Sequence, residues 1–362
     1  MKRILLCLLC AALLLGGCTQ QPASPPEDDG RLKIVATVFP AYDFARSAAG
    51  GHADVTMLLP PGMESHSYEP TPADILAVQN CDLFICLGGE SDAWVDTILS
   101  AIEPKGEILR MVDCVELLEE AHVEGMQLDP GHSHEGHDHG EDEVCTQPEE
   151  HIHSEAEEAL QEHDHEEHGD ESHDDHAAEN PLNLGAVVGM DEHVWTSPRN
   201  AAHITLEIGR RLAELDQANA GAYRHNAAAY AAQIDALDQE FEDFFESLPR
   251  RTIVFGDRFP LLYFAERYEL DYYAAFPGCG TQTEPSAATI AFLTEKVLTE
   301  NIPTVWYIEF SNHLVADSIA EATERGTAMF HTCHNVTKAE LDGGATYLSL
   351  MEGNLETLKA CF

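Results

Sequence analysis

The chain has 362 residues, with 65 acidic residues against 19 lysines and arginines and a formal net charge of −46 at pH 7. A surface this acidic argues strongly against nucleic acid as a partner and favours cations. Twenty of the acids lie in residues 129–179, which contain no lysine or arginine. The rest of the chain is long enough for two domains with substantial cores.

Residues 1–17 are typical of an export signal, because Lys2 and Arg3 precede an apolar run over residues 4–15. That run is too short to span a bilayer permanently. The sequence LGGC at residues 15–18 resembles the bacterial lipobox, in which the cysteine is diacylated and becomes the mature N-terminus. We therefore expect Cys18 to carry a lipid, with residues 18–30 as anchor and flexible tether. The protein is then extracytoplasmic and lipid-anchored to the bacterial cell membrane.

Residues 31–197 are expected to form an N-terminal α/β lobe, because apolar strand-like runs alternate with helical stretches. Threonine and proline at residues 71 and 72 supply a helix cap and first turn. Strands are predicted at residues 33–39, 53–59, 81–87 and 108–112, and helices at 71–79 and 94–101.

This lobe is interrupted at residues 129–179 by a histidine- and acid-rich segment, which we expect to be disordered because it has too little apolar surface to bury. Imidazole is a common ligand for borderline divalent metals, and the H-x-H and H-x-x-H spacings argue against a merely solubilising segment. The segment is predicted to be an auxiliary metal-binding loop. Its eleven histidines are His132, His134, His137, His139, His151, His153, His163, His165, His168, His173 and His176.

Residues 198–249 are predicted to be helical and to contain one long bridging helix. Apolar residues recur at spacings of three and four over residues 222–248. With Asp216 as its cap, the helix would run about 30 residues, or roughly 45 Å.

Residues 250–362 repeat the α/β pattern and are expected to form a C-terminal lobe. Strands are predicted at residues 252–255, 270–275, 304–310 and 327–330, and helices at 260–267, 286–300, 314–324 and 345–360. The predicted fold class is therefore α/β, with two mainly parallel lobes bridged by one long helix and the ligand in the cleft between them.

Two segments place a histidine in a loop near a predicted strand end or helix start. Residues 60–70 (PPGMESHSYEP) contain His66, and residues 191–198 (DEHVWTSP) contain His193. Both segments resemble the signatures of metal-binding lipoproteins of zinc and manganese ABC importers, the cluster A-I substrate-binding proteins, especially the zinc branch. The resemblance extends from about residue 33 to the C-terminus and implies a metal held between two lobes. It places His66 and His193 on the first two metal ligands.

The remaining ligand positions depart from that pattern. Gly256 stands where the family has a histidine or glutamate. Neighbouring Asp257 could reach into the site, but it is equally suited to pairing with Arg258 or capping the helix near Pro260. The fourth position falls in FHTCH at residues 330–334, where His331 matches the ligand column best and His334 is the alternative. Cys333 is a further candidate, since a thiolate favours zinc over manganese.

Glu309 ends a predicted strand and is expected to face the same cleft, as a ligand or as an acceptor that orients a histidine. Three imidazoles with one carboxylate or water would make a tetrahedral zinc site. The predicted metal set is therefore His66, His193, His331 and Glu309. Seven cysteines follow Cys18, so they cannot all pair within the chain, and a Cys279–Cys333 disulfide stays open.

The resemblance implies a high-affinity zinc-binding component of an ABC importer that delivers Zn²⁺ to a permease and its ATPase. Manganese is less favoured because it prefers more carboxylate oxygen. Alternatives are a manganese- or iron-binding importer component, or a surface metal buffer or adhesin. A secreted metallohydrolase is disfavoured, because neither His134-Glu135 nor His165-Glu166 continues into H-E-x-x-H. We expect a monomer that is not an enzyme.

Overall fold

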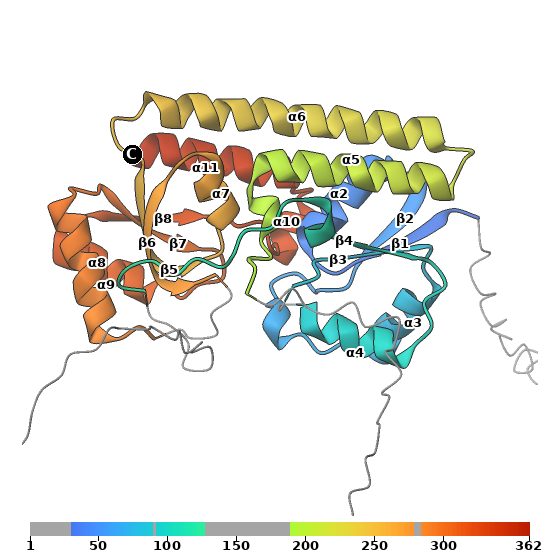
Figure 1. Ribbon diagram of the computed structural model, residues 1–362, viewed down its shortest axis with the longest axis horizontal. Coiled ribbons are helices and arrows are strands. Elements are labelled where there is room, and N and C mark those ends of the chain that lie inside the picture. The colour runs from blue at the N-terminus through green and yellow to red at the C-terminus, as the bar shows by residue number, and fades with distance from the viewer. Residues whose placement is uncertain (1–29, 90–91, 127–188, 279–283) are drawn as a thin grey trace, which may run out of the picture.

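The structure is a computed structural model, and it describes residues 30–89, 92–126, 189–278 and 284–362. It contains two separate four-stranded sheets, ordered β2-β1-β3-β4 and β6-β5-β7-β8. Every strand pairing in both sheets is parallel. In Figure 1 the two sheets lie side by side and helix α6 runs along both. The predicted class, two α/β lobes with parallel sheets and a long bridging helix, is confirmed.

The N-terminal lobe is built on the first sheet. Its strands are β1 (Leu32–Ala36), β2 (Ala53–Met57), β3 (Leu83–Cys86) and β4 (Glu107–Arg110), and its helices are α2 (Phe39–Ala49), α3 (Pro72–Asn80) and α4 (Ala93–Ala101). Every residue of β3 is buried, as expected for the centre of a parallel sheet. Helix α3 begins as predicted, with a capping box at its start. The Thr71 hydroxyl accepts from the Asp74 backbone N–H, and the Asp74 carboxylate accepts from the Thr71 backbone N–H.

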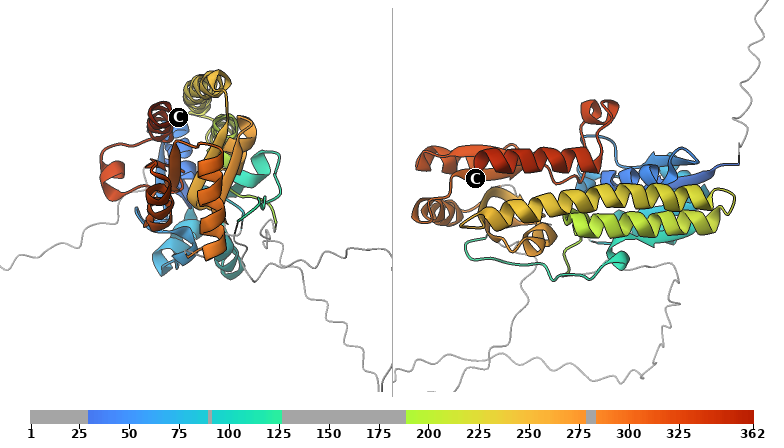
Figure 2. Two further views of the ribbon diagram at one scale, coloured as in Figure 1. Left: turned by 90° about the vertical axis from the view of Figure 1, so that its left-hand side faces the viewer. Right: turned by 90° about the horizontal axis from the view of Figure 1, so that it is seen from above.

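Helices α5 (Pro198–Leu215) and α6 (Ala220–Ser247) pack against each other along one side of the molecule, as the two views in Figure 2 show. Gly209 permits the close approach, since a Cβ atom there would lie 2.3 Å from the Cβ of Ala227. With 28 residues, α6 is roughly 42 Å long and reaches both lobes.

The C-terminal lobe is built on the second sheet. Its strands are β5 (Thr252–Phe259), β6 (Asp271–Pro277), β7 (Thr304–Ile308) and β8 (Gly326–Phe330). Its helices are α7 (Leu262–Arg267), α8 (Ala287–Thr299), α9 (Leu314–Thr323), α10 (Lys338–Asp342) and α11 (Tyr347–Cys361). Short 3-10 turns, η1 (Ser65–Ser67), η3 (Met111–Cys114) and η4 (Val194–Thr196), lie in the connecting segments.

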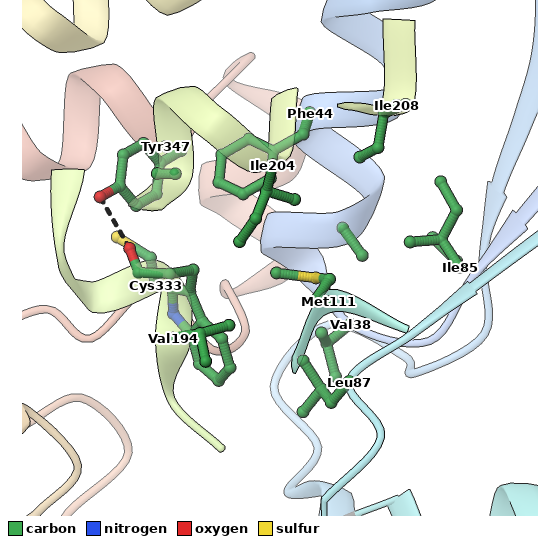
Figure 3. Packing of buried hydrophobic residues seen from close by; sticks show 14 of the residues in the cluster. Val38, Phe44, Ile85, Leu87, Met111, Val194, Ile204, Ile208, Cys333 and Tyr347 are labelled. Atoms are coloured by element: carbon green, nitrogen blue, oxygen red, sulfur yellow. Dashed lines mark hydrogen bonds between the residues drawn. The ribbon is translucent and has the colours of Figure 1, made fainter. Parts of the chain in front are cut away.

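One apolar core continues from the first lobe into the second. The cluster drawn in Figure 3 includes Val38 and Phe44 of the N-terminal lobe, Ile204 of α5, and Cys333 and Tyr347 of the C-terminal lobe. Because apolar burial is the main favourable term in folding, this shared core fixes the two lobes to each other.

A buried carboxylate reinforces the join. Asp43 on α2 accepts hydrogen bonds from the Tyr230 hydroxyl of α6 at 2.5 Å and from the Tyr347 backbone N–H of α11 at 2.8 Å. It also pairs with Arg46 at 2.7 Å. A single side chain therefore connects the first lobe, the bridging helix and the second lobe.

Two short segments, residues 118–120 and 189–191, form what we call the neck. Glu119 and Met190 make an antiparallel bridge, and the backbone N–H of Asp191 donates to the Leu118 carbonyl at 2.9 Å. The backbone N–H of Leu118 donates to the Tyr263 hydroxyl of α7 at 3.1 Å. The neck therefore lies on the C-terminal lobe.

Two sequence expectations were wrong in detail. Helix α6 begins at Ala220 with Asn219 at the cap, whereas Asp216 lies in the preceding turn and accepts from the N–H groups of Ala218 and Asn219. The second difference is α2, which was not predicted, because a strand was expected over residues 33–39 with Pro40 just beyond its end. Here it occupies the first turn of a helix, where its missing N–H costs nothing.

The predicted export signal, Cys18, the eleven clustered histidines and Cys279 lie outside the described residues. Within the part of the chain that the structure describes, no helix combines the length and apolar character needed to cross a membrane.

Candidate metal centre

A cavity of about 470 Å³, part of it open to solvent, lies where the two lobes meet. Both lobes contribute to its wall, and two imidazoles and two carboxylates are among the lining groups. The lining residues are Met63, Glu64, Ser65, His193, Arg258, Pro260, Gly278, Ile308, Glu309, Phe310, Thr332, His334 and Asn335.

His66 lies in the turn η1, directly after the cavity-lining residue Ser65. The turn is anchored behind it, because the Tyr68 hydroxyl donates to Asp74 at 2.9 Å and the Tyr68 ring packs edge-on against Trp94. The described part of the structure thus places the backbone of His66 next to a residue of the cavity wall, whereas its side chain lies outside the description.

His193 is buried and held in one orientation. Asp191 accepts a hydrogen bond from the His193 backbone N–H at 2.7 Å and lies 3.0 Å from its ring Nδ1. A proton on Nδ1 leaves Nε2 with its lone pair, the arrangement typical of metal-bound histidine. Burial by itself lowers the pKa of His193, but the charge of Asp191, with Glu192 and Glu120, outweighs it and raises that pKa above its usual value.

His334 is the second imidazole in the cavity. Its ring centroid lies 6.1 Å from that of His193, and Trp195 packs against both rings at 5.4 Å. Two imidazoles this close can direct nitrogen atoms at one ion between them. The structure thus brings together His193 and the residue that was expected only as the alternative in the FHTCH segment.

His331, the first choice from sequence, is not among the residues lining the cavity. Its Nδ1 accepts a hydrogen bond from the Cys333 backbone N–H at 2.9 Å, and its Nε2 lies 3.8 Å from a carboxylate oxygen of Glu340 on α10. The chain turns between His331 and His334 because Cys333 has a φ of 63°. This turn directs the two imidazoles to different surroundings, a distinction that sequence spacing does not reveal.

Glu309 lines the cavity at the end of β7, as expected. Its two carboxylate oxygens accept from the Thr332 backbone N–H at 2.7 Å and the Thr332 hydroxyl at 2.5 Å. The carboxylate therefore holds the loop that carries His334, and each oxygen keeps a further lone pair for a cation.

Gly256, at the position where the sequence resemblance predicts a metal ligand, faces away from the cavity. A Cβ atom on Gly256 would lie 2.5 Å from the Ala316 Cα of helix α9, so glycine is required for the packing of helix on sheet. The Asp257 carboxylate is also turned away from the cavity, and it accepts hydrogen bonds from the backbone N–H groups of Arg258 and Ile308. Neither residue supplies a donor to the cavity.

Arg258 is the group that this strand does contribute. Its guanidinium pairs with Glu64 of the other lobe at 2.9 Å. Burial alone would lower the pKa of Arg258, but the Glu64 carboxylate more than offsets this and raises it. From sequence, Arg258 was expected only as a partner for Asp257, and no sequence signal marked Glu64.

Cys333 is a free and fully buried thiol. Burial raises its pKa well above the usual value, an effect strengthened by the charge of Glu309. A thiol that resists ionisation is a poor metal ligand, so its contribution is to the core shown in Figure 3. Among the described residues no three histidine, cysteine, aspartate or glutamate side chains are grouped closely enough to hold an ion.

Comparison with known proteins identifies the family. The family described as zinc-uptake complex component A periplasmic (ZnuA) matches residues 34–361. The zinc-binding lipoprotein AdcA of Streptococcus pneumoniae serotype 4 is 28% identical over 99% of this chain, which spans only 61% of that protein. The high-affinity zinc uptake system protein ZnuA of Bacillus subtilis is 26% identical over 98% of this chain and 94% of that protein.

Solved structures agree with the fold. The Zn(II)-bound ZnuA-like domain of Streptococcus pneumoniae AdcA superposes with a TM-score of 0.65 at 23% identity, covering 92% of this chain and 99% of that one. This likeness concerns the fold, whereas the sequence match covers nearly the whole chain and defines the membership. The chain belongs to the family of periplasmic zinc-uptake component A proteins.

Proposed function

We propose that this protein is the extracytoplasmic component of a zinc ABC importer, which captures Zn²⁺ between its two lobes and delivers it to a permease served by an ATPase. The observation that carries the proposal is the cavity between the lobes, where His193 and His334 lie with Glu309. Imidazole-rich surroundings with one carboxylate suit zinc better than manganese.

The proposed ligands are His66, His193 and His334, with Glu309 as a fourth ligand or as the acceptor that holds the His334 loop. His334 takes the place expected for His331, because His334 lines the cavity and His331 does not. The His331 ring lies between Glu309, 3.7 Å from its Nδ1, and Glu340, 3.8 Å from its Nε2. Zinc is the transported cargo here, and the site has to release it as well as bind it.

The family is a transport component, which supports capture of the ion rather than catalysis. The proposal extends to a lipid on Cys18 and to a monomer beside its permease. It also assigns residues 129–179 an auxiliary role, in which their histidines collect loosely bound zinc close to the cavity. An adhesin or surface-buffer role remains the alternative, and a neighbouring permease gene would separate it from the importer role.

The test is zinc titration by calorimetry, with and without residues 129–179, combined with a matched pair of variants. His334→Asn removes the proposed ligand, whereas His331→Asn keeps an acceptor for the Cys333 N–H and removes only the second ring nitrogen. We expect one tight site that survives loop deletion, a loss of affinity of at least about 100-fold in His334→Asn, and near-normal affinity in His331→Asn.

The reverse pattern, with His331→Asn losing the site and His334→Asn keeping it, would return the ligand assignment to His331. Loss of all tight binding on loop deletion would instead contradict the proposed cavity site and favour a surface buffer.

A further inference from the structure

The N-terminal loop at residues 60–64, which leads directly into His66, is held by the C-terminal lobe. The side-chain amide of Asn335 donates two hydrogen bonds across the cleft, to the backbone carbonyl oxygens of Pro60 and Met63, both at 2.8 Å. Asn335 is only 2% exposed. Breaking these bonds would therefore leave buried polar groups without partners, which is costly.

Two further contacts hold the same loop. The Gly62 backbone N–H donates to the Val336 carbonyl at 2.8 Å, and Gly62 has a φ of 81°, which favours glycine. Arg258 pairs with Glu64 at 2.9 Å. We call these contacts, together with the two hydrogen bonds of Asn335, the cross-lobe grip.

The loop that makes the grip is itself anchored inside the C-terminal lobe. Asn354 on α11 accepts from the His331 N–H at 2.8 Å and donates to the His331 carbonyl at 2.7 Å. His334 follows in this anchored loop, one residue before Asn335. The grip therefore ties the loop that carries His334 to the loop that leads into His66.

We infer that Asn335 is a positioning residue that sets how long the cavity retains a bound metal ion, without touching the ion. The inference rests on the proposed function, since retention has meaning only for a cavity that binds metal. A metal held between two loops leaves when the loops separate, and the grip adds its hydrogen bonds to the barrier for that separation. Asn335 therefore acts on the rate of release more than on the choice of metal.

Asn335→Asp is the informative substitution, because it keeps the side-chain shape and removes both donors. It also places a carboxylate oxygen against two carbonyl oxygens. Asn354→Asp is the matched control, since Asn354 is equally buried at 3% exposure and holds the same loop from within its own lobe. Both variants lose an amide donor, but only the first loses contacts between the lobes.

The full chain is loaded with one equivalent of zinc and mixed with excess chelator in a stopped-flow instrument, and the slowest phase is followed. The thermal midpoint of the metal-free protein is recorded in parallel. We expect Asn335→Asp to accelerate the slow phase by roughly tenfold or more, and Asn354→Asp by less than about threefold at a comparable loss of thermal midpoint. A release rate in Asn335→Asp within twofold of wild type, or equal acceleration in the two variants, would overturn the inference.

Glu64→Gln provides a second route in case Asn335→Asp does not fold, because it weakens the grip at a partly exposed side chain. We expect roughly threefold faster release from this variant, and unchanged release would count against the grip. A wild-type chain with no slow phase contradicts the proposed zinc site itself, whereas normal wild-type retention with unchanged variants contradicts only the role of Asn335.

Discussion

At residue 256 this chain has no side chain, and this separates it from the metal-ligand pattern that the resemblance predicts. Gly256 stands where a metal-binding side chain is expected, yet the backbone there faces Ala316 of α9. The donors of the cavity come instead from loops at the strand ends, including the loop after β8 that carries His334. Restoring a histidine at the family position would therefore act on packing and would add no ligand.

Gly256→His is expected to destabilise the metal-free protein by at least about 2 kcal/mol, because the new side chain would overpack the contact between β5 and α9. Zinc affinity should not rise. Gly353→Ala on α11 is the control, since a Cβ atom there meets nothing within 4 Å, and it should stabilise by roughly 0.5–1 kcal/mol. Urea unfolding measures both, and tighter zinc binding by Gly256→His would contradict the packing argument.

Asp92 predicts a pH dependence of stability at the same scale. Burial raises the pKa of Asp92 to about 6, although the Leu87 N–H donates to its carboxylate at 2.6 Å. A folded-state pKa above the unfolded value of 3.8 means that the native protein binds the proton more tightly, so this group lowers stability as the pH rises through 6. Most of that loss is complete by about pH 7.

Relative to Asp92→Asn, the wild-type free energy of unfolding should therefore fall by about 1.5 kcal/mol between pH 5 and pH 7.5. Chemical denaturation of both proteins across this range gives the difference directly. A difference that does not change with pH would show that Asp92 is ionised throughout.

At the scale of elements, helices α2, α6 and α11 meet at one buried carboxylate rather than through apolar packing alone. The Asp43 carboxylate accepts hydrogen bonds from the Tyr230 hydroxyl of α6 and the Tyr347 backbone N–H of α11. Arg46 supplies the opposite charge. Removing a charge from such a network costs more than removing an exposed one, because the partners stay buried.

Asp43→Asn is expected to lower the free energy of unfolding by about 2–4 kcal/mol, since it keeps one acceptor and leaves Arg46 without its counter-charge. Asp235→Asn, at an exposed position of α6, should change stability by less than about 0.5 kcal/mol. Equal effects of the two substitutions in a denaturant titration would remove Asp43 from its connecting role.

Sequence patterns predicted most strands and the long helix α6. Buried parallel strands have continuous apolar runs, and α6 has a clear apolar stripe. The patterns failed where a local signal had two meanings. Pro40 fits both a strand end and a helix start. His331 and His334 lie in one loop, and only the backbone turn at Cys333 places one of them in the cavity wall and not the other. The lobe contacts of Asn335 left no sequence signal, because they depend on backbone carbonyls brought together by the fold.

At the scale of the whole molecule, the lobes share one apolar core, and the buried contacts at Asp43 and Asn335 also cross between them. We expect the metal-free protein to unfold in one transition, with calorimetric and van't Hoff enthalpies in agreement. Two resolved transitions in differential scanning calorimetry would show instead that the lobes are independent folding units.

The neck has a consequence for how this fold accommodates inserted sequence. Its bridge between Glu119 and Met190 closes the chain before the histidine-rich stretch begins, so the length of that stretch places little demand on the rest of the protein. For a flexible insertion, each doubling of length costs only about 0.6 kcal/mol in closure entropy. The neck is therefore a natural grafting point, because a fluorescent reporter domain inserted between residues 120 and 189 would leave the bridge and both lobes intact.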